Sequence, residues 1–236
     1  MIKLINNELN KVKKSRLLFS QILFVVALYI MKRMSSNSII DLSYNLIPFV
    51  GIMICVLFGG IVSNEVENGS FRYYLTKPYK RWKVYLSKLL CILIYVFITL
   101  IIIITSTVLL SNYYDNDYVI KFFKYSIPVI FMSSLIMYLS TRFKSQSLCV
   151  GLSIFILAFS LIISQILFGI KINIIEYTFL PYLDFSIFND RVSLSNMNNE
   201  LGIHLCLRNG IIIDTIYFIV FFFIGCYKFN KKDIKN

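Results

Sequence analysis

The side chains that could do acid–base or metal chemistry are few in this chain and widely spaced. Its 236 residues include 12 Asp and Glu, one His and five Cys. Acid–base catalysis needs groups within hydrogen-bond reach of each other and the substrate, and zinc sites need closely spaced Cys or His. Here His204 stands alone, Glu176, Asp184 and Asp190 are dispersed, and no C-x-x-C pair occurs. The sequence therefore predicts no enzyme, no catalytic residue and no metal site.

Asp214 is the one acid inside an apolar run, Ile211–Tyr227. An intramembrane carboxylate is a functional candidate by default. However, it follows Gly210 by only four residues, near the end of the run, where a carboxylate can reach water or a polar contact. We favour a structural role over a functional one.

Composition places these residues in a membrane. The hydrophobic fraction is 58%, the charged fraction 15% and the mean hydropathy +0.73, whereas soluble domains carry roughly 25% charged residues. Continuously apolar runs favour helices over a barrel. The sequence predicts an all-α membrane protein with six transmembrane helices, at Leu17–Met31, Leu46–Ser63, Leu89–Leu110, Phe122–Ser140, Leu148–Ile170 and Ile211–Tyr227.

The basic residues predict the orientation of the spans. With both termini cytoplasmic, 17 of the 24 Lys and Arg fall on the inner side, as the positive-inside rule requires. The net charge of +12 then faces an anionic lipid leaflet, and no nucleic-acid partner is expected. The whole chain forms one membrane domain, with an interfacial helix (1–16), spans 1 and 2 (17–63), a cytoplasmic segment (64–88), spans 3 to 5 (89–170), an outer loop (171–210), and span 6 with its tail (211–236).

The first residues predict an amphipathic helix on the inner membrane surface. At 100° per residue, Ile2, Ile5, Leu9 and Val12 fall within an arc of about 80°. A solvated basic tail is the alternative.

The segment from Asn64 to Lys88 is the most distinctive part of the sequence. It mixes six basic residues with Phe71, Tyr73, Tyr74, Leu75 and Trp82. A short helix ending before Pro78 would suit a mechanical contact with another protein, because the residue before proline leaves the helical region. An interfacial loop with aromatic anchors explains the same residues equally well.

This segment resembles the permeases of type-2 ATP-binding-cassette exporters. The matching positions are Glu67 and Gly69 at its start, Pro78 and Arg81 at a turn, and Lys88 opening the next span. The motif covers about 25 residues, and Ser70 stands where many relatives have Thr. The resemblance implies a coupling helix from about Glu65 to Tyr79 that docks on a separate ATPase subunit. The implied coupling residues are Glu65, Glu67, Gly69, Phe71, Arg72, Tyr73, Lys77, Pro78 and Arg81.

The partners follow from the same resemblance. The chain has no Gly-Lys dipeptide and hence no phosphate-binding loop, so ATP and Mg²⁺ would be bound by the ATPase partner and no cofactor by this chain. Six spans are half of an exporter, which implies a homodimer or a paralogous second permease. The re-entrant element of the family would correspond to Tyr177–Phe185, for which an aromatic belt at the interface is the alternative.

The expected function is export. An apolar path with polar accents suits amphipathic peptide or hydrophobic cargo, and similar small permeases of Gram-positive bacteria export bacteriocins and phenol-soluble-modulin-type toxins. The predicted path residues are Ser153, Ser160, Gln165 and Asp214. The alternatives are a non-transporting immunity or sensor subunit and a membrane-embedded enzyme.

Overall fold

The structure, a computed structural model, describes residues 2–12, 14–34, 38–70, 80–111, 116–169, 177–183 and 205–231. Every regular element in these ranges is helical, which confirms the predicted all-α class. The helices are α1 (Ile2–Lys11), α2 (Lys14–Met34), α3 (Ile39–Asn45), α4 (Ile47–Phe58), α5 (Ser63–Glu67), α7 (Arg81–Ser111), α8 (Asn116–Tyr125), α9 (Ile127–Arg142), α10 (Gln146–Gly169), the 3₁₀ turn η2 (Leu180–Tyr182) and α12 (Leu207–Lys231).

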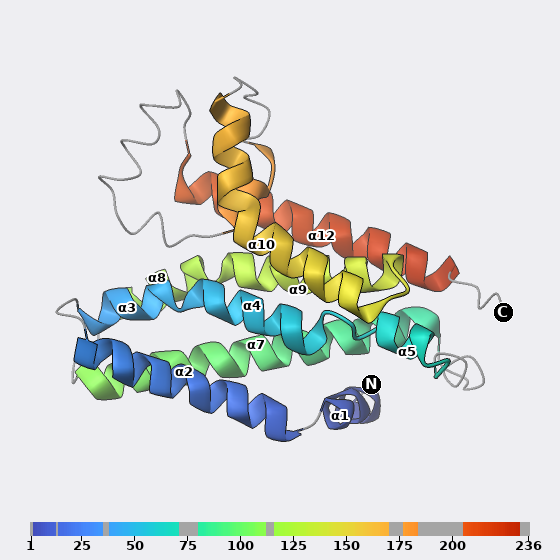
Figure 1. The fold of residues 1–236 in the computed structure, drawn as a ribbon, viewed down its shortest axis with the longest axis horizontal. Coiled ribbons are helices and arrows are strands. Elements are labelled where there is room, and N and C mark those ends of the chain that lie inside the picture. Colours follow the sequence, from blue (N-terminus) through green and yellow to red (C-terminus); the bar gives the residue numbers. More distant parts are fainter. Residues whose placement is uncertain are drawn as a thin grey trace.

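The helices form an elongated bundle around α7, which α1, α2, α3, α4, α9 and α12 all contact (Figure 1). The helix α1, the short helix α5 and the end of α12 lie together at one end, which we call the α1 end (Figure 1). The helices α3 and α8 lie at the opposite end, which we call the α3 end. The second half of α10 turns away from the bundle axis.

Five helical segments are long and apolar enough to cross a membrane: Ser15–Met34, Ile39–Glu67, Arg81–Ser111, Asn116–Arg142 and Leu207–Lys231. They correspond to predicted spans 1, 2, 3, 4 and 6. Predicted span 5 corresponds to α10, of which Gln146–Ser160 is a shorter apolar helix. A crossing by α10 stays a prediction.

Two of the spans are interrupted. The second breaks at Leu46, before Pro48, and again over residues 59–62, between α4 and α5. The fourth breaks at Ser126, and Pro128 lies in the first turn of α9. Proline has no backbone N–H and is best tolerated in a first helical turn. Pro128 therefore explains why a new helix begins after Ser126.

Helices reach into the predicted 64–88 segment from both ends. The helix α5 (Ser63–Glu67) lies at its start, and α7 begins at Arg81, eight residues before the apolar run at Leu89. The bounds of this segment relative to the membrane stay a prediction. Hydropathy placed the start of the span after Lys88 because it is charged. In the folded chain, buried carboxylates neutralise this lysine, and the helix runs through it.

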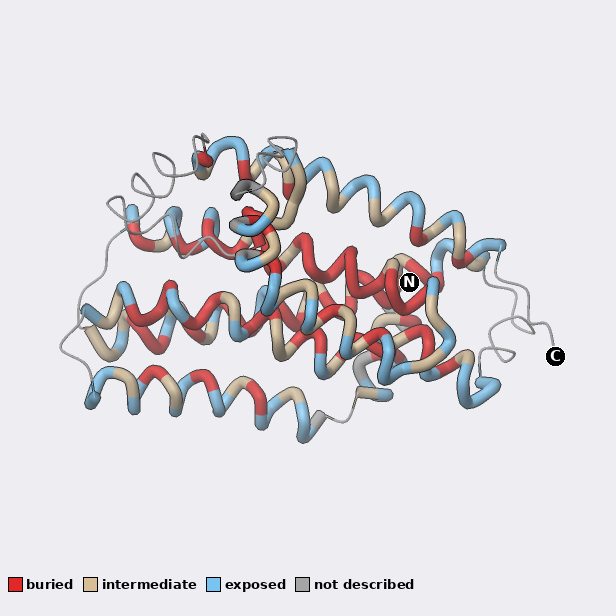
Figure 2. Tube along the Cα trace, turned by 45° about the horizontal axis from the view of Figure 1, so that its top comes forward, coloured by how far each residue is buried: buried red, intermediate tan, exposed pale blue. Residues whose placement is uncertain are grey.

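Burial is concentrated on the inner faces of the central helices, while α2 and α12 expose much of their surface (Figure 2). The most extensive pairing among the described elements is α12 along α9. Gly225 of α12 permits the close approach of Tyr85 of α7, because a Cβ there would overlap the Tyr85 hydroxyl, whereas Tyr138 Cα of α9 would lie at an ordinary contact distance of 3.5 Å.

The described part of the predicted outer loop packs onto the bundle. Phe179 contacts the rings of Phe131 and Tyr217, with centroids 5.2 Å away in each case. The residues Pro181 and Tyr182 of η2 are buried. The predicted aromatic segment therefore contacts protein, and its re-entrant placement stays a prediction.

Candidate functional site

A cluster of buried charges joins three helices at the α1 end. The Lys88 side chain of α7 is completely buried, and its Nζ lies 2.8 Å from Glu8 Oε2 of α1 and 2.7 Å from Glu65 Oε1 of α5. Both glutamate side chains are also buried. A buried ammonium is tolerated only when it is paired and hydrogen-bonded. Lys88 therefore joins residues that are 80 and 23 positions away in the sequence.

Lys11 completes the cluster from the solvent side. Its Nζ lies 2.6 Å from Glu65 Oε1 and 3.1 Å from Glu8 Oε1. Partial burial by itself lowers the pKa of Lys11, but the ion pairs with Glu65 and Glu8 outweigh it, and the pKa rises above its ordinary 10.5. A raised lysine pKa stabilises the folded state below that value, and the contribution is lost as the pH rises through the folded-state pKa.

The cluster is electrically balanced, with two lysines against two glutamates. Removing one member of such a network leaves an uncompensated charge, which costs far more than the intact network contributes. Glu8 and Lys11 hold α1, Glu65 holds α5, and Lys88 holds α7. The four residues therefore form a joint, called here the charge cluster, that keeps these helices in one arrangement.

Glu67 extends the connections of α5 to a fourth helix. Its Oε2 accepts a hydrogen bond of 3.1 Å from the backbone N–H of Gln146, the first residue of α10. The first N–H groups of a helix have no partner within the helix, and a carboxylate there also interacts favourably with the helix dipole. Gln146 lies against Gly60, where a Cβ would overlap its side chain.

Ser140 of α9 stabilises the break that precedes α5. Its hydroxyl oxygen accepts from Val62 N at 2.8 Å and from Ser63 N at 3.0 Å. The chain turns over residues 59–62, and these two N–H groups find their acceptor on another helix. The position of α5 is therefore set by α1, α7, α9 and α10 together.

The predicted coupling segment begins where α5 ends. Gly69 has a φ of 68°, in the left-handed region that favours glycine after a helix. Arg81 is the next predicted coupling residue that the structure describes, and its Nη1 donates to Asn230 O of α12 at 2.7 Å. The predicted residues Phe71, Arg72, Tyr73, Lys77 and Pro78 lie outside the described residues, as does most of the predicted coupling helix.

The predicted path residues have separate local environments. Ser153 and Ser160 of α10 are buried and donate to the carbonyls of Val150 and Leu157, three positions earlier in the same helix. Such back-bonding satisfies a hydroxyl in an apolar helix. The side chain of Gln165 lies outside the described part of the chain.

Asp214 differs from its expectation, because the structure buries it completely. Neither carboxylate oxygen has a hydrogen-bond partner within the described residues. Asp214 is therefore buried although it lies near the end of predicted span 6, and its place on a translocation path stays a prediction.

Four residues of the site were not predicted from the sequence: Glu8, Lys11, Ser140 and Gln146. Glu8 carried a signal, since it is the only acid in an otherwise basic amphipathic helix and lies beside the apolar arc. Pairing it with Lys88 required the three-dimensional fold. No group of three or more Cys, His, Asp or Glu in the described ranges could hold a metal ion.

These features define a multi-pass helical membrane protein with a charged joint at one end of its bundle. The sequence profile described as "Protein of unknown function (DUF2705)" matches residues 9–235, and the chain belongs to this family. It is also similar to the "Uncharacterized protein YhcI" of Bacillus subtilis (strain 168). The two are 22% identical over 219 residues, which is 82% of this chain and 67% of that protein.

Proposed function

We propose that this chain is the permease subunit of an ATP-binding-cassette exporter that moves amphipathic peptide or hydrophobic cargo outward, powered by a separate ATPase subunit. The observation that carries the proposal is the set of contacts made by α5. Glu65 joins α5 to α1 and α7, and Glu67 joins it to α10. These two residues lie at the start of the segment that resembles a coupling helix, which runs from about Glu65 to Tyr79. A displacement of that segment would therefore reach several spans through short polar contacts.

The proposed mechanism has two mechanical parts. Closure of the ATPase pair would push on the segment that follows Gly69, and α5 would transmit the displacement. The charge cluster would keep α1 and α7 moving with α5, while the Glu67 contact would act on the start of α10. Rigid helices joined by a few polar contacts are a common means of switching between two packed arrangements.

A homodimer, or a pairing with a second permease, would complete the exporter. Spans 2 and 5 would face each other across that dimer, and cargo would enter from the inner leaflet or the cytoplasm. The α1 end is the cytoplasmic end in this proposal. It carries Arg16, Arg81, Lys83, Arg142, Lys144, Lys228 and Lys231, which agrees with the positive-inside rule.

The test is purification of the tagged full-length chain after expression together with its genomic neighbours. We expect an ATPase subunit to copurify in mild detergent. Glu67→Gln should keep that ATPase bound, because its contact lies within this chain, but should lower transport and cargo-stimulated ATP hydrolysis several-fold. Arg72→Ala should also uncouple transport, because Arg72 lies in the segment expected to dock on the ATPase.

Asp117→Asn is the matched control, since it changes an exposed acid at the α3 end. This variant should behave as the unmodified protein does. Failure to recover any ATPase, or normal export with both Glu67→Gln and Arg72→Ala in place, would overturn the proposal.

A further inference from the structure

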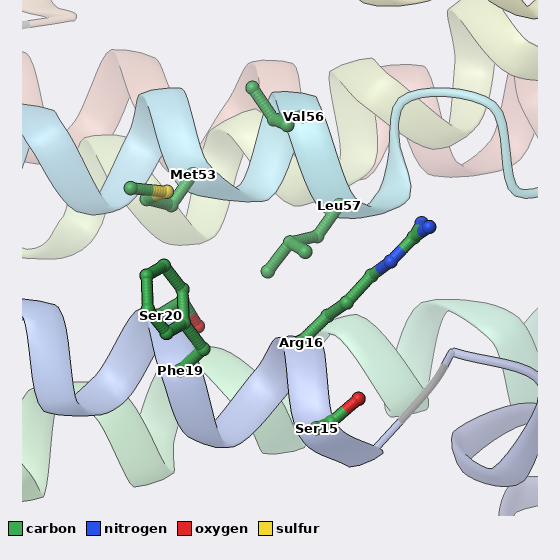
Figure 3. A pocket seen from close by; sticks show the side chains of 7 residues that line it. All are labelled: Ser15, Arg16, Phe19, Ser20, Met53, Val56 and Leu57. Atoms are coloured by element: carbon green, nitrogen blue, oxygen red, sulfur yellow. The ribbon is translucent and has the colours of Figure 1, made fainter.

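An apolar groove lies between α2 and α4 near the α1 end of the bundle. It has a volume of about 490 Å³ and is lined by Ser15, Arg16, Phe19, Ser20, Met53, Val56 and Leu57. In Figure 3, Met53 and Leu57 of α4 point toward Phe19 of α2. Its volume lies within the usual range of about 300–1,000 Å³ for small-ligand sites.

The groove forms because α2 packs on α7 and α3 rather than along α4. Beneath it, the hydroxyls of Ser20 and Tyr95 lie 2.7 Å apart and satisfy each other. The walls of the groove are therefore apolar. Its lining residues all belong to Ser15–Met34 and Ile39–Glu67, two segments that are apolar enough to cross a membrane. A long aliphatic chain parallel to the helices fits these walls.

A polar pocket of about 460 Å³ adjoins the groove at the α1 end. The two share Arg16, Val56 and Leu57, and the lining of the polar pocket adds Asn64, Gln146 and three members of the charge cluster, Glu8, Lys11 and Glu65. The Arg16 side chain extends past Leu57 toward this pocket (Figure 3). The apolar groove therefore opens directly into the polar pocket.

Counted together with the buried Lys88, which is paired with its Glu8 and Glu65, the polar pocket carries one positive charge in excess. The two lysines and two glutamates of the charge cluster balance each other. Arg16 is exposed and takes part in none of the ion pairs among the described residues. A guanidinium presents several N–H donors in a fork that matches phosphate oxygens. Basic pockets at the ends of spans bind anionic lipid head groups in this way.

We propose that this groove is a binding site for one anionic phospholipid of the surrounding leaflet. An acyl chain lies between α2 and α4 against Phe19, Met53 and Leu57, and the phosphate pairs with Arg16. Asn64 and Gln146, both exposed, also line this pocket, where the rest of the head group would lie. The inference concerns the lipid alone and does not depend on the proposed export function.

The test uses tryptophan quenching by brominated lipid. The chain has a single tryptophan, so Trp82→Phe with Phe19→Trp leaves one reporter in the groove. The full chain is reconstituted into vesicles of equal parts phosphatidylglycerol and phosphatidylcholine, with bromine on the acyl chains of one or the other. Trp82→Phe with Ile219→Trp is the reference, because Ile219 lies on the exposed face of α12.

We expect the reporter at position 19 to favour brominated phosphatidylglycerol over phosphatidylcholine about fivefold, the effect of one basic residue near an anionic lipid. The reporter at position 219 should show no preference. Arg16→Gln should abolish the preference at position 19, whereas Arg208→Gln, at the other end of the bundle, should leave it unchanged. Excess inorganic phosphate should not displace the lipid, because phosphate gains nothing from the apolar groove.

Three results would overturn the inference. Equal quenching by the two lipids at position 19 would mean that the groove holds only bulk lipid. A preference that survives Arg16→Gln would mean that Arg16 does not bind the head group. Quenching by neither lipid would mean that a protein surface, such as a second copy of this chain, fills the groove.

Discussion

At the scale of single residues, the interior at the α1 end is organised by polar contacts between distant parts of the chain. Lys88 is completely buried, where an unpaired charge would strongly destabilise the fold. Its ion pairs with Glu8 and Glu65 make this position possible. Ser140 has a similar role for uncharged groups, because it accepts two backbone N–H bonds at the break before α5. Both contacts lead to testable expectations.

Replacing Lys88 by Met should destabilise the protein by about 3–5 kcal/mol, because two buried carboxylates would lose a shared cation. Thermal or denaturant unfolding of the purified protein in detergent measures this. The double change Lys88→Gln with Glu65→Gln keeps the cluster neutral and should recover much of the loss. Lys144→Met, at an exposed position, is the control. A Lys88→Met variant as stable as the parent would refute the cluster's structural role.

Replacing Ser140 by Ala should cost about 1–3 kcal/mol, because the N–H groups of Val62 and Ser63 would lose their acceptor in a buried place. Ser133 offers a matched control on the same helix. It is equally buried, and its hydroxyl donates to Ile130 O of its own helix. Ser133→Ala should therefore change the unfolding midpoint little. Equal effects of the two substitutions would show that Ser140 does not stabilise the break.

At the scale of helices, close packing explains more than hydropathy does. The helices α7, α9 and α12 approach one another where Gly225 faces Tyr85 and the backbone of α9. Tyr85 is completely buried, and its hydroxyl has no hydrogen-bond partner among the described residues. The ring is fixed by packing against Phe222 and Phe229, so it has little room to move.

Gly225→Ala should therefore destabilise the bundle by about 1–3 kcal/mol through overpacking. Adding Tyr85→Phe removes the overlapping oxygen and should relieve part of that loss, and Tyr85→Phe alone should not destabilise the protein. Gly151→Ala, in open space on α10, should be neutral or slightly stabilising, because alanine favours helices over glycine. Unfolding midpoints of the four variants decide the matter. A loss of stability with Tyr85→Phe alone would contradict this packing.

At the scale of the whole molecule, the positions of the ends relative to the membrane are the main prediction. Met34, at the α3 end, and Lys83, at the α1 end, are both exposed. With Cys206 and Cys226 replaced by Ser, Met34→Cys should react with a membrane-impermeant maleimide added to intact cells. Lys83→Cys should react only after permeabilisation. The reverse pattern would invert the proposed orientation.

The same method tests whether α10 completes a sixth span. Ser147, at its start, and Tyr177, beyond its end, are both exposed. If α10 crosses, Ser147→Cys should label from the inside and Tyr177→Cys from the outside. Labelling of both from one side would reduce the protein to five spans and place its termini on opposite sides.

The sequence by itself determined the helical class and the five helical segments that are long and apolar enough to cross a membrane, because hydropathy acts over short stretches of chain. It also singled out Glu65, Glu67 and Lys88, although only from a resemblance. It missed Glu8 and Ser140, because their roles depend on partners 77 to 80 residues away in the sequence. Whether a charge can be buried depends on what the folded chain places beside it, and only the tertiary structure decides that.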